Sequence, residues 1–111
     1  MDKRLVVDHN LWPTPEGVYI RLVVVRGCGE GKERLRAEGL DLVLYSCEEV
    51  PLRDNASAYR FFRGIGIDLE LIYGETSRVK IFRSKGNYED VLQKLLAVVE
   101  PEEGAPSWAK S

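Results

Sequence analysis

The sequence predicts a two-layer α+β domain with the element order ββαββα, a mixed four-stranded sheet and two helices on one face. Three observations predict it. Residues 18–25 (VYIRLVVV) are rich in β-branched side chains, which favour a strand. Two later segments carry apolar residues at helical spacing, and two apolar runs, LELIY and VKIF, flank the polar stretch GETSR at 74–78. The chain has 111 residues and suits one domain, which we expect to span residues 1–100.

The N-terminal half predicts two of the four strands. Residues 1–14 have no clear periodicity, and we expect a short edge strand at residues 5–7 (LVV). The stretch TPEG at 14–17 predicts a turn before the strand at 18–25, because proline and glycine suit turn dihedrals. Four glycines make residues 26–39 a long polar connection. Residues 40–46 (LDLVLYS) alternate in polarity and form the second strand.

The C-terminal half supplies both helices and the other two strands. Apolar residues at helical spacing predict a helix with Asp54 or Asn55 as its N-cap and with Gly64 and Gly66 at its end. Strands follow at 69–73 and 79–82. The last helix begins after Asn87 and carries an apolar stripe made of Tyr88, Val91, Leu92, Leu95, Leu96 and Val99. Pro101 ends this helix, and we expect residues 101–111 to be a flexible tail.

Several motifs do not indicate chemistry. The glycine cluster at 27–32 lacks the first glycine and the final hydroxyl residue of a phosphate-binding loop. His9 has no catalytic partner nearby in the sequence. If strands 18–25 and 40–46 form a hairpin, Cys28 and Cys47 lie at its opposite ends, so we expect two separate thiols. We therefore expect no metal and no cofactor.

Charge and hydropathy limit the location and the partners. The net charge of −2 is unlike that of a domain whose whole surface binds nucleic acid. No apolar run is long enough for a membrane span or a signal peptide, so we expect a cytosolic protein without a membrane partner. Residues 53–85 are nonetheless mildly basic, whereas residues 86–111 are acidic.

The GETSR stretch is the candidate site. Strand 40–46, the helix and strand 69–73 form a β-α-β step, which would place GETSR beside the segment DNAS at 54–57, where helical N–H groups attract anions. Hydroxyl and cationic side chains could add donors for phosphate or carboxylate. The candidate anion-binding residues are Asn55, Ser57, Thr76, Ser77, Arg78 and Lys80. The alternative is a capped hairpin in which Asp54 or Glu75 neutralises Arg78.

Three functions are compatible with this pattern, and the sequence does not indicate an oligomeric state. The first is a binding module for RNA or single-stranded DNA, because phosphate contacts need only donors and positive charge. The second is an enzyme that acts on a phosphorylated small molecule, with Ser77 as the nearest hydroxyl. The third is an interaction protein in which an exposed strand at 79–83 pairs with a partner.

These residues resemble the YggU-like family of small uncharacterised proteins. The resemblance covers roughly residues 15–97 and is closest in LELIYGETSRVKIF at 69–82. The family motif Gly-x-x-Ser-Arg-x-Lys matches at Gly74, Ser77, Arg78 and Lys80. The family's Gly-Lys-Ala-Asn segment is replaced by DNAS at 54–57, which removes one lysine. The resemblance implies a two-layer fold with two helices on one face of a mixed sheet, and it implies no reaction.

Overall fold

The computed structural model of the chain describes residues 2–28, 31–48 and 51–101, with the backbone alone for 51–54. Within these residues the elements are α1 (Lys3–His9), β1 (Leu11–Thr14), β2 (Gly17–Arg26), β3 (Arg34–Glu38), β4 (Asp41–Ser46), α2 (Pro51–Gly64), β5 (Glu70–Tyr73), β6 (Val79–Ser84) and α3 (Tyr88–Val98). The fold class is α+β, as predicted. The described chain has three helices and a six-stranded sheet, so the predicted ββαββα order and four strands are wrong in detail.

The sheet is mixed and has the order β3-β4-β2-β6-β5, while β1 pairs with β2. Strands β2 and β4 are parallel, and the other pairs are antiparallel. The β-α-β step therefore does not join neighbours, because β2 and β6 lie between β4 and β5. These pairings still give β5 the same direction as β4. Strand β6 is internal, so the prediction that residues 79–83 offer an exposed edge is wrong.

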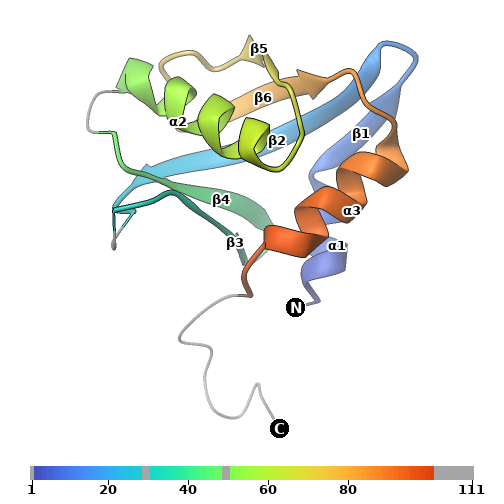
Figure 1. Ribbon diagram of the computed structural model, residues 1–111, viewed down its shortest axis with the longest axis horizontal. Helices are drawn as coiled ribbons and strands as arrows, with labels where there is room; N and C mark the ends of the chain where they lie inside the picture. Colours follow the sequence, from blue (N-terminus) through green and yellow to red (C-terminus); the bar gives the residue numbers. More distant parts are fainter. Residues whose placement is uncertain (1, 29–30, 49–50, 102–111) are drawn as a thin grey trace, which may run out of the picture.

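All three helices cover one face of the sheet (Figure 1). Alternate residues of β2, from Val18 to Val24, are buried against them. They join one apolar cluster with Phe62 of α2, Leu95 of α3 and Val7 of α1. The amphipathic helices hide their apolar faces in this layer, which is the main source of their stability.

The predicted strand at residues 5–7 is instead part of helix α1. Asp2 caps the helix by accepting a hydrogen bond from the Arg4 amide at 3.0 Å. Val6 and Val7 are buried, so both β-branched residues of this short helix pack into the core. Lys3 Nζ donates to the carbonyl of Leu96 at 3.2 Å, near the end of α3. Tertiary packing has overridden the β propensity of this segment.

Strand β3 lies inside the segment predicted as a polar connection. Leu35 and Ala37 are buried, whereas the residues between and around them are only partly covered. Gly39, with φ +61°, makes the short turn to β4, where Glu38 pairs with Asp41. The charged outer face of β3 obscured its period-2 pattern in a stretch that also contains several glycines.

Helix α2 begins at Pro51, so Asp54 and Asn55 lie inside it and are not its N-cap. Proline suits the first helical position because the amide it lacks would have no intrahelical acceptor. The predicted end is confirmed: the helix stops at Gly64, and Gly66 adopts φ +83°. Lys94 Nζ of α3 donates to the Gly66 carbonyl at 2.9 Å, which fixes this terminus against the neighbouring helix.

The turn at TPEG and the last helix are confirmed. Thr14 pairs with Gly17 across the turn. Gly17 has φ +135°, and a Cβ there would lie 2.2 Å from the Ser84 carbonyl oxygen, so only glycine fits. The Asn87 side chain caps α3 by accepting from the Asp90 amide at 2.8 Å. The expected tail lies outside the described residues from residue 102 onward.

The prediction of two separate thiols is wrong, because Cys28 and Cys47 form a disulfide with Cα atoms 4.9 Å apart. That prediction assumed an antiparallel hairpin of residues 18–25 and 40–46. Strand β3 intervenes and makes β2 and β4 parallel, with Arg26 paired to Ser46. Both cysteines therefore leave the sheet at the same edge.

Candidate functional site

The candidate site lies where three strands end and α2 begins. Strands β2, β4 and β5 all end at one edge of the sheet, and the GETSR turn connects β5 to β6 at that edge (Figure 1). In open sheets with helical crossovers, ligands commonly bind outside the carboxyl ends of parallel strands. We call this place the carboxyl edge. It contains Arg26, the disulfide and residues 74–78.

The GETSR turn has a fixed backbone and an exposed tip. Gly74 adopts φ +90°, and a Cβ there would lie 2.3 Å from the Val79 carbonyl oxygen. The Ser77 amide donates to the Gly74 carbonyl at 3.0 Å. Ser77 Oγ accepts a hydrogen bond from the Val79 amide at 3.1 Å. Thr76, Ser77 and Arg78 remain exposed, so the turn presents two hydroxyls and a guanidinium to solvent.

Two of the predicted site residues hold this turn on α2. Asn55 Nδ2 donates to the Glu75 carbonyl at 3.3 Å, which places the first half of α2 beside GETSR as the sequence indicates. Lys80 Nζ donates to the same carbonyl at 3.0 Å and to the Gly74 carbonyl at 2.9 Å. Lys80 has no exposed surface and Asn55 is only 9% exposed. Both residues therefore position the turn rather than face solvent.

Ser57 lies on the opposite side of α2 from the turn. It is fully buried, and its Oγ accepts from Ser46 Oγ of β4 at 2.8 Å. Arg60 Nη2 also donates to Ser57 Oγ at 3.3 Å. The two serines join the helix to the end of β4. Ser57 is not brought together with Asn55 and Arg78, because residues two apart on a helix point in nearly opposite directions.

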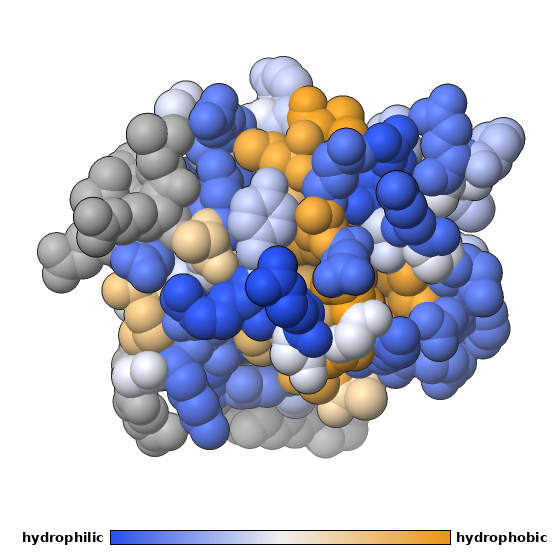
Figure 2. Space-filling view, turned by 45° about the horizontal axis from the view of Figure 1, so that its top comes forward, coloured by the Kyte–Doolittle hydropathy of each residue, from blue (hydrophilic) through white to orange (hydrophobic). Residues whose placement is uncertain are grey.

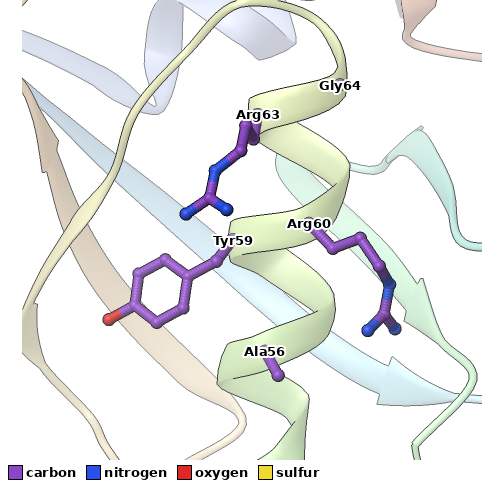
Figure 3. Close-up of a pocket in the computed structure, with 5 residues that line it drawn as sticks. All are labelled: Ala56, Tyr59, Arg60, Arg63 and Gly64. Carbon is purple, nitrogen blue, oxygen red and sulfur yellow. The ribbon is translucent and has the colours of Figure 1, made fainter.

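A shallow hollow lies on the outward face of α2 (Figure 3). It is lined by Ala56, Tyr59, Arg60, Arg63 and Gly64. Tyr59 and Arg63 point to one side of the helix, whereas Arg60 points to the other. The Tyr59 ring meets Phe82 of β6 edge to face, with centroids 5.8 Å apart. Asn55, Tyr59 and Arg63 follow one another at intervals of four residues, so Arg63 lies about 12 Å along the helix from Asn55.

The surface over α2 and β5 mixes polar and apolar groups. Figure 2 shows a band of hydrophobic side chains between hydrophilic ones on this side of the molecule. Ile72 and Tyr73 of β5 are 42% and 67% exposed. Such a surface offers apolar contact as well as charge.

The arginines fall into two groups. Arg21, Arg34, Arg36, Arg60 and Arg83 each form an ion pair. Arg60 pairs with Glu33 at 2.9 Å and with Glu48 at 3.5 Å, and the hydrogen bond to Glu33 is the main reason that its pKa is raised. In the part of the chain that the structure describes, Arg4, Arg26, Arg63 and Arg78 form no ion pair with a carboxylate, and all four are exposed. Arg4 lies in α1, whereas the other three lie at the carboxyl edge or on α2.

Arg26 and Arg78 are neighbours at the carboxyl edge. The Val24 amide donates to the Arg78 carbonyl at 2.8 Å, which extends the β2–β6 pairing to these residues. Arg26 follows Val24 by two positions, so its Cα lies about 7–8 Å from that of Arg78. Both residues continue the series of side chains that face the helices.

Sequence reasoning missed Arg26, Tyr59 and Arg63. Arg26 continues the alternating pattern that begins at Val18. The predicted strand ended at residue 25, one residue before Arg26. Tyr59 and Arg63 follow Asn55 at helical spacing, a pattern that was not used to locate the site.

Neither a metal centre nor a membrane span emerges from the described residues. No three histidine, cysteine or acidic side chains there gather as metal ligands. No helix among these residues is long and apolar enough to cross a membrane.

Comparison with known proteins gives no relative. No family model, no curated protein and no solved structure matches the chain. The resemblance of residues 69–82 to the YggU-like family therefore stays a prediction.

Proposed function

We propose that the protein is a binding module for RNA or single-stranded DNA, which it contacts from the carboxyl edge along the outward face of α2. The observation that carries this proposal is a group of exposed arginines at the carboxyl edge and on α2 that form no ion pair with any carboxylate of the described residues, namely Arg26, Arg63 and Arg78. An arginine that already pairs with a carboxylate must lose that partner before it binds a phosphate. These three arginines have no such partner to lose. The planar guanidinium also matches the geometry of phosphate oxygens.

Each part of the surface has a role in the proposed complex. Arg26 and Arg78 contact neighbouring phosphate groups, with the hydroxyls of Thr76 and Ser77 beside them. The half-buried Tyr59 ring offers one face to a base, and Arg63 contacts a phosphate further along. Stacking on an aromatic ring tolerates any base, so the binding needs no sequence preference. The low net charge of the chain restricts attraction to this local surface.

An oligonucleotide titration tests the proposal. Fluorescence anisotropy of a labelled 12-mer of uridine, measured at several salt concentrations, gives the slope of log K against log salt. For a single strand this slope changes by about 0.7 for each phosphate contact. We expect Arg78→Ala to weaken binding and to flatten the slope by about 0.7.

Arg4→Ala is the matched control. Arg4 is also exposed, but it lies in α1 at the opposite end of the molecule from the carboxyl edge (Figure 1). The Arg4→Ala variant should bind the oligonucleotide with the same affinity and the same salt slope as the wild type. Titrations that stay flat at low salt for the wild type would remove the proposal.

A further inference from the structure

We propose that the Cys28–Cys47 disulfide is a redox switch that controls whether Arg60 is available to an anionic ligand. The inference rests on the proposed function, because it concerns the regulation of the same surface. In the oxidised protein the disulfide keeps two carboxylates on Arg60. In the reduced protein those carboxylates loosen, and Arg60 joins Arg63 on the outward face of α2.

The disulfide is linked to both carboxylate partners of Arg60 through short chain segments. Cys47 is followed directly by Glu48, whose carboxylate lies 3.5 Å from Arg60 Nη2. Cys28 begins the connection that leads to Glu33, whose carboxylate lies 2.9 Å from Arg60 Nε. The disulfide joins these two connections at the carboxyl edge.

The hydrogen bonds around Cys47 extend this link to the helix. The Glu48 amide donates to Ser46 Oγ at 3.0 Å, and Ser46 Oγ donates to Ser57 Oγ of α2. Arg60 Nη2 donates to the same Ser57 oxygen. Both chain neighbours of Cys47 are therefore connected to Arg60: Ser46 through Ser57, and Glu48 through its own carboxylate. A change in the position of Cys47 acts directly on these contacts.

The ion pairs hold Arg60 in a position where it contributes little to binding. Glu33 is only 11% exposed and Glu48 27%, so both carboxylates are partly shielded from water, whereas Arg60 is 54% exposed. Two carboxylates more than neutralise one guanidinium. Arg60 nevertheless lines the same hollow as Arg63 and Tyr59. Loss of the carboxylates would therefore add a positive charge to the proposed path of the strand.

Both cysteines are only partly buried, so part of each residue is open to a reductant. A thiolate of a dithiol reductant attacks one sulfur, forms a mixed disulfide and releases the other cysteine as a thiolate, which takes up a proton. The second thiol of the reductant then resolves the mixed disulfide, so two electrons and two protons reach Cys28 and Cys47. A disulfide in a cytosolic protein is usually transient and often senses redox state.

The first measurement does not involve nucleic acid. The ¹H–¹⁵N signal of Arg60 Nε–Hε is followed by NMR in the oxidised protein and after addition of dithiothreitol. We expect this signal to move toward the position of a solvated arginine on reduction. The double variant Cys28→Ser/Cys47→Ser should resemble the reduced protein and should not respond to dithiothreitol. An Arg60 signal that is the same in both states would overturn the switch.

The second measurement is the salt dependence of binding to the uridine 12-mer. Reduction should steepen the slope by about 0.7, which corresponds to one added phosphate contact. In the oxidised protein, Glu33→Gln/Glu48→Gln should reproduce that change without touching the disulfide, and Arg60→Ala should abolish the redox difference. Equal slopes for oxidised and reduced wild type that binds RNA would contradict the proposal. If Arg60 moves on reduction but no form binds RNA, the proposed function fails and the proposed link between disulfide and Arg60 stands.

Discussion

Reduction of the disulfide should destabilise the fold by about 3 kcal/mol. Cys28 and Cys47 lie 19 positions apart in the sequence, and the bond between them restricts the unfolded chain. For a loop of this length the chain-entropy relation gives a loss of about 11 cal/mol/K, or about 3 kcal/mol at 25 °C. The ends of β2 and β4 are held together by their own pairing, so the sheet stays closed when the bond opens, and the folded state gains freedom only in the segments that follow the two strands.

Urea unfolding followed by circular dichroism measures this loss. With a slope of about 2 kcal/mol/M, typical of small domains, the midpoint should fall by about 1.5 M when dithiothreitol is added. Cys28→Ser/Cys47→Ser should unfold at the lower midpoint with or without the reductant. Identical midpoints for the wild type in both conditions would refute the reasoning, since they would mean that the cysteines do not constrain the unfolded chain.

Two further predictions concern the turn and the pH dependence of stability. Gly74→Ala should lower the free energy of unfolding by about 2 kcal/mol or more, because it forces alanine into a positive φ and against the Val79 carbonyl. Gly64→Ala, which meets only open space, should be neutral or slightly stabilising in the same urea assay. The hydrogen bond from Arg34 is the main cause that lowers the pKa of Glu100. Because this pKa is depressed in the folded state, the pair stabilises the fold above the ordinary glutamate value of 4.5 and stops doing so as pH falls through the lower value. The free energy of unfolding should therefore drop more steeply at acid pH in the wild type than in Arg34→Met. Parallel pH profiles would contradict this assignment, and the effect should be modest because the pair is partly exposed.

The parts of the fold that the sequence predicts are those with a strong local pattern. The β-branched run before Arg26, the apolar stripe of α3 and the glycines at the end of α2 each specify an element through nearby residues. The segments at 5–7 and 34–38 do not. Val6 and Val7 are helical because α1 packs on the core, and β3 exists because β4 offers it a partner strand. Long-range contacts that no local window contains decide both.

Because the sheet prediction lacked β3, the prediction for the two cysteines was also wrong. One missing strand reversed the expected direction of β4 relative to β2 and separated Cys28 from Cys47 in the predicted hairpin. GETSR nevertheless lies close to α2, as the sequence predicted. Strand β5 still runs in the same direction as β4, and Asn55 reaches the Glu75 carbonyl.

The sequence predicted where the candidate site lies, but not which of its side chains are exposed and available for a ligand. Helical and strand spacing located the turn and the helix, yet they gave no information on burial. The sequence suggests that Lys80 binds a ligand. In the structure Lys80 is buried, and its Nζ donates a hydrogen bond to a backbone carbonyl of the turn. Arg63 looked like an ordinary solvated charge. Whether an arginine has a carboxylate partner depends on side chains from distant segments, as Glu33 and Arg60 illustrate.

The most direct test of the binding surface is an NMR titration of the ¹⁵N-labelled protein with the uridine 12-mer at low salt. We expect the largest amide shifts at Arg26, at residues 74–78 and along α2 from Asn55 to Arg63, with little change in α1. Shifts that cluster instead in α1 and α3, or a spectrum that does not change at all, would contradict the proposal that the carboxyl edge binds nucleic acid.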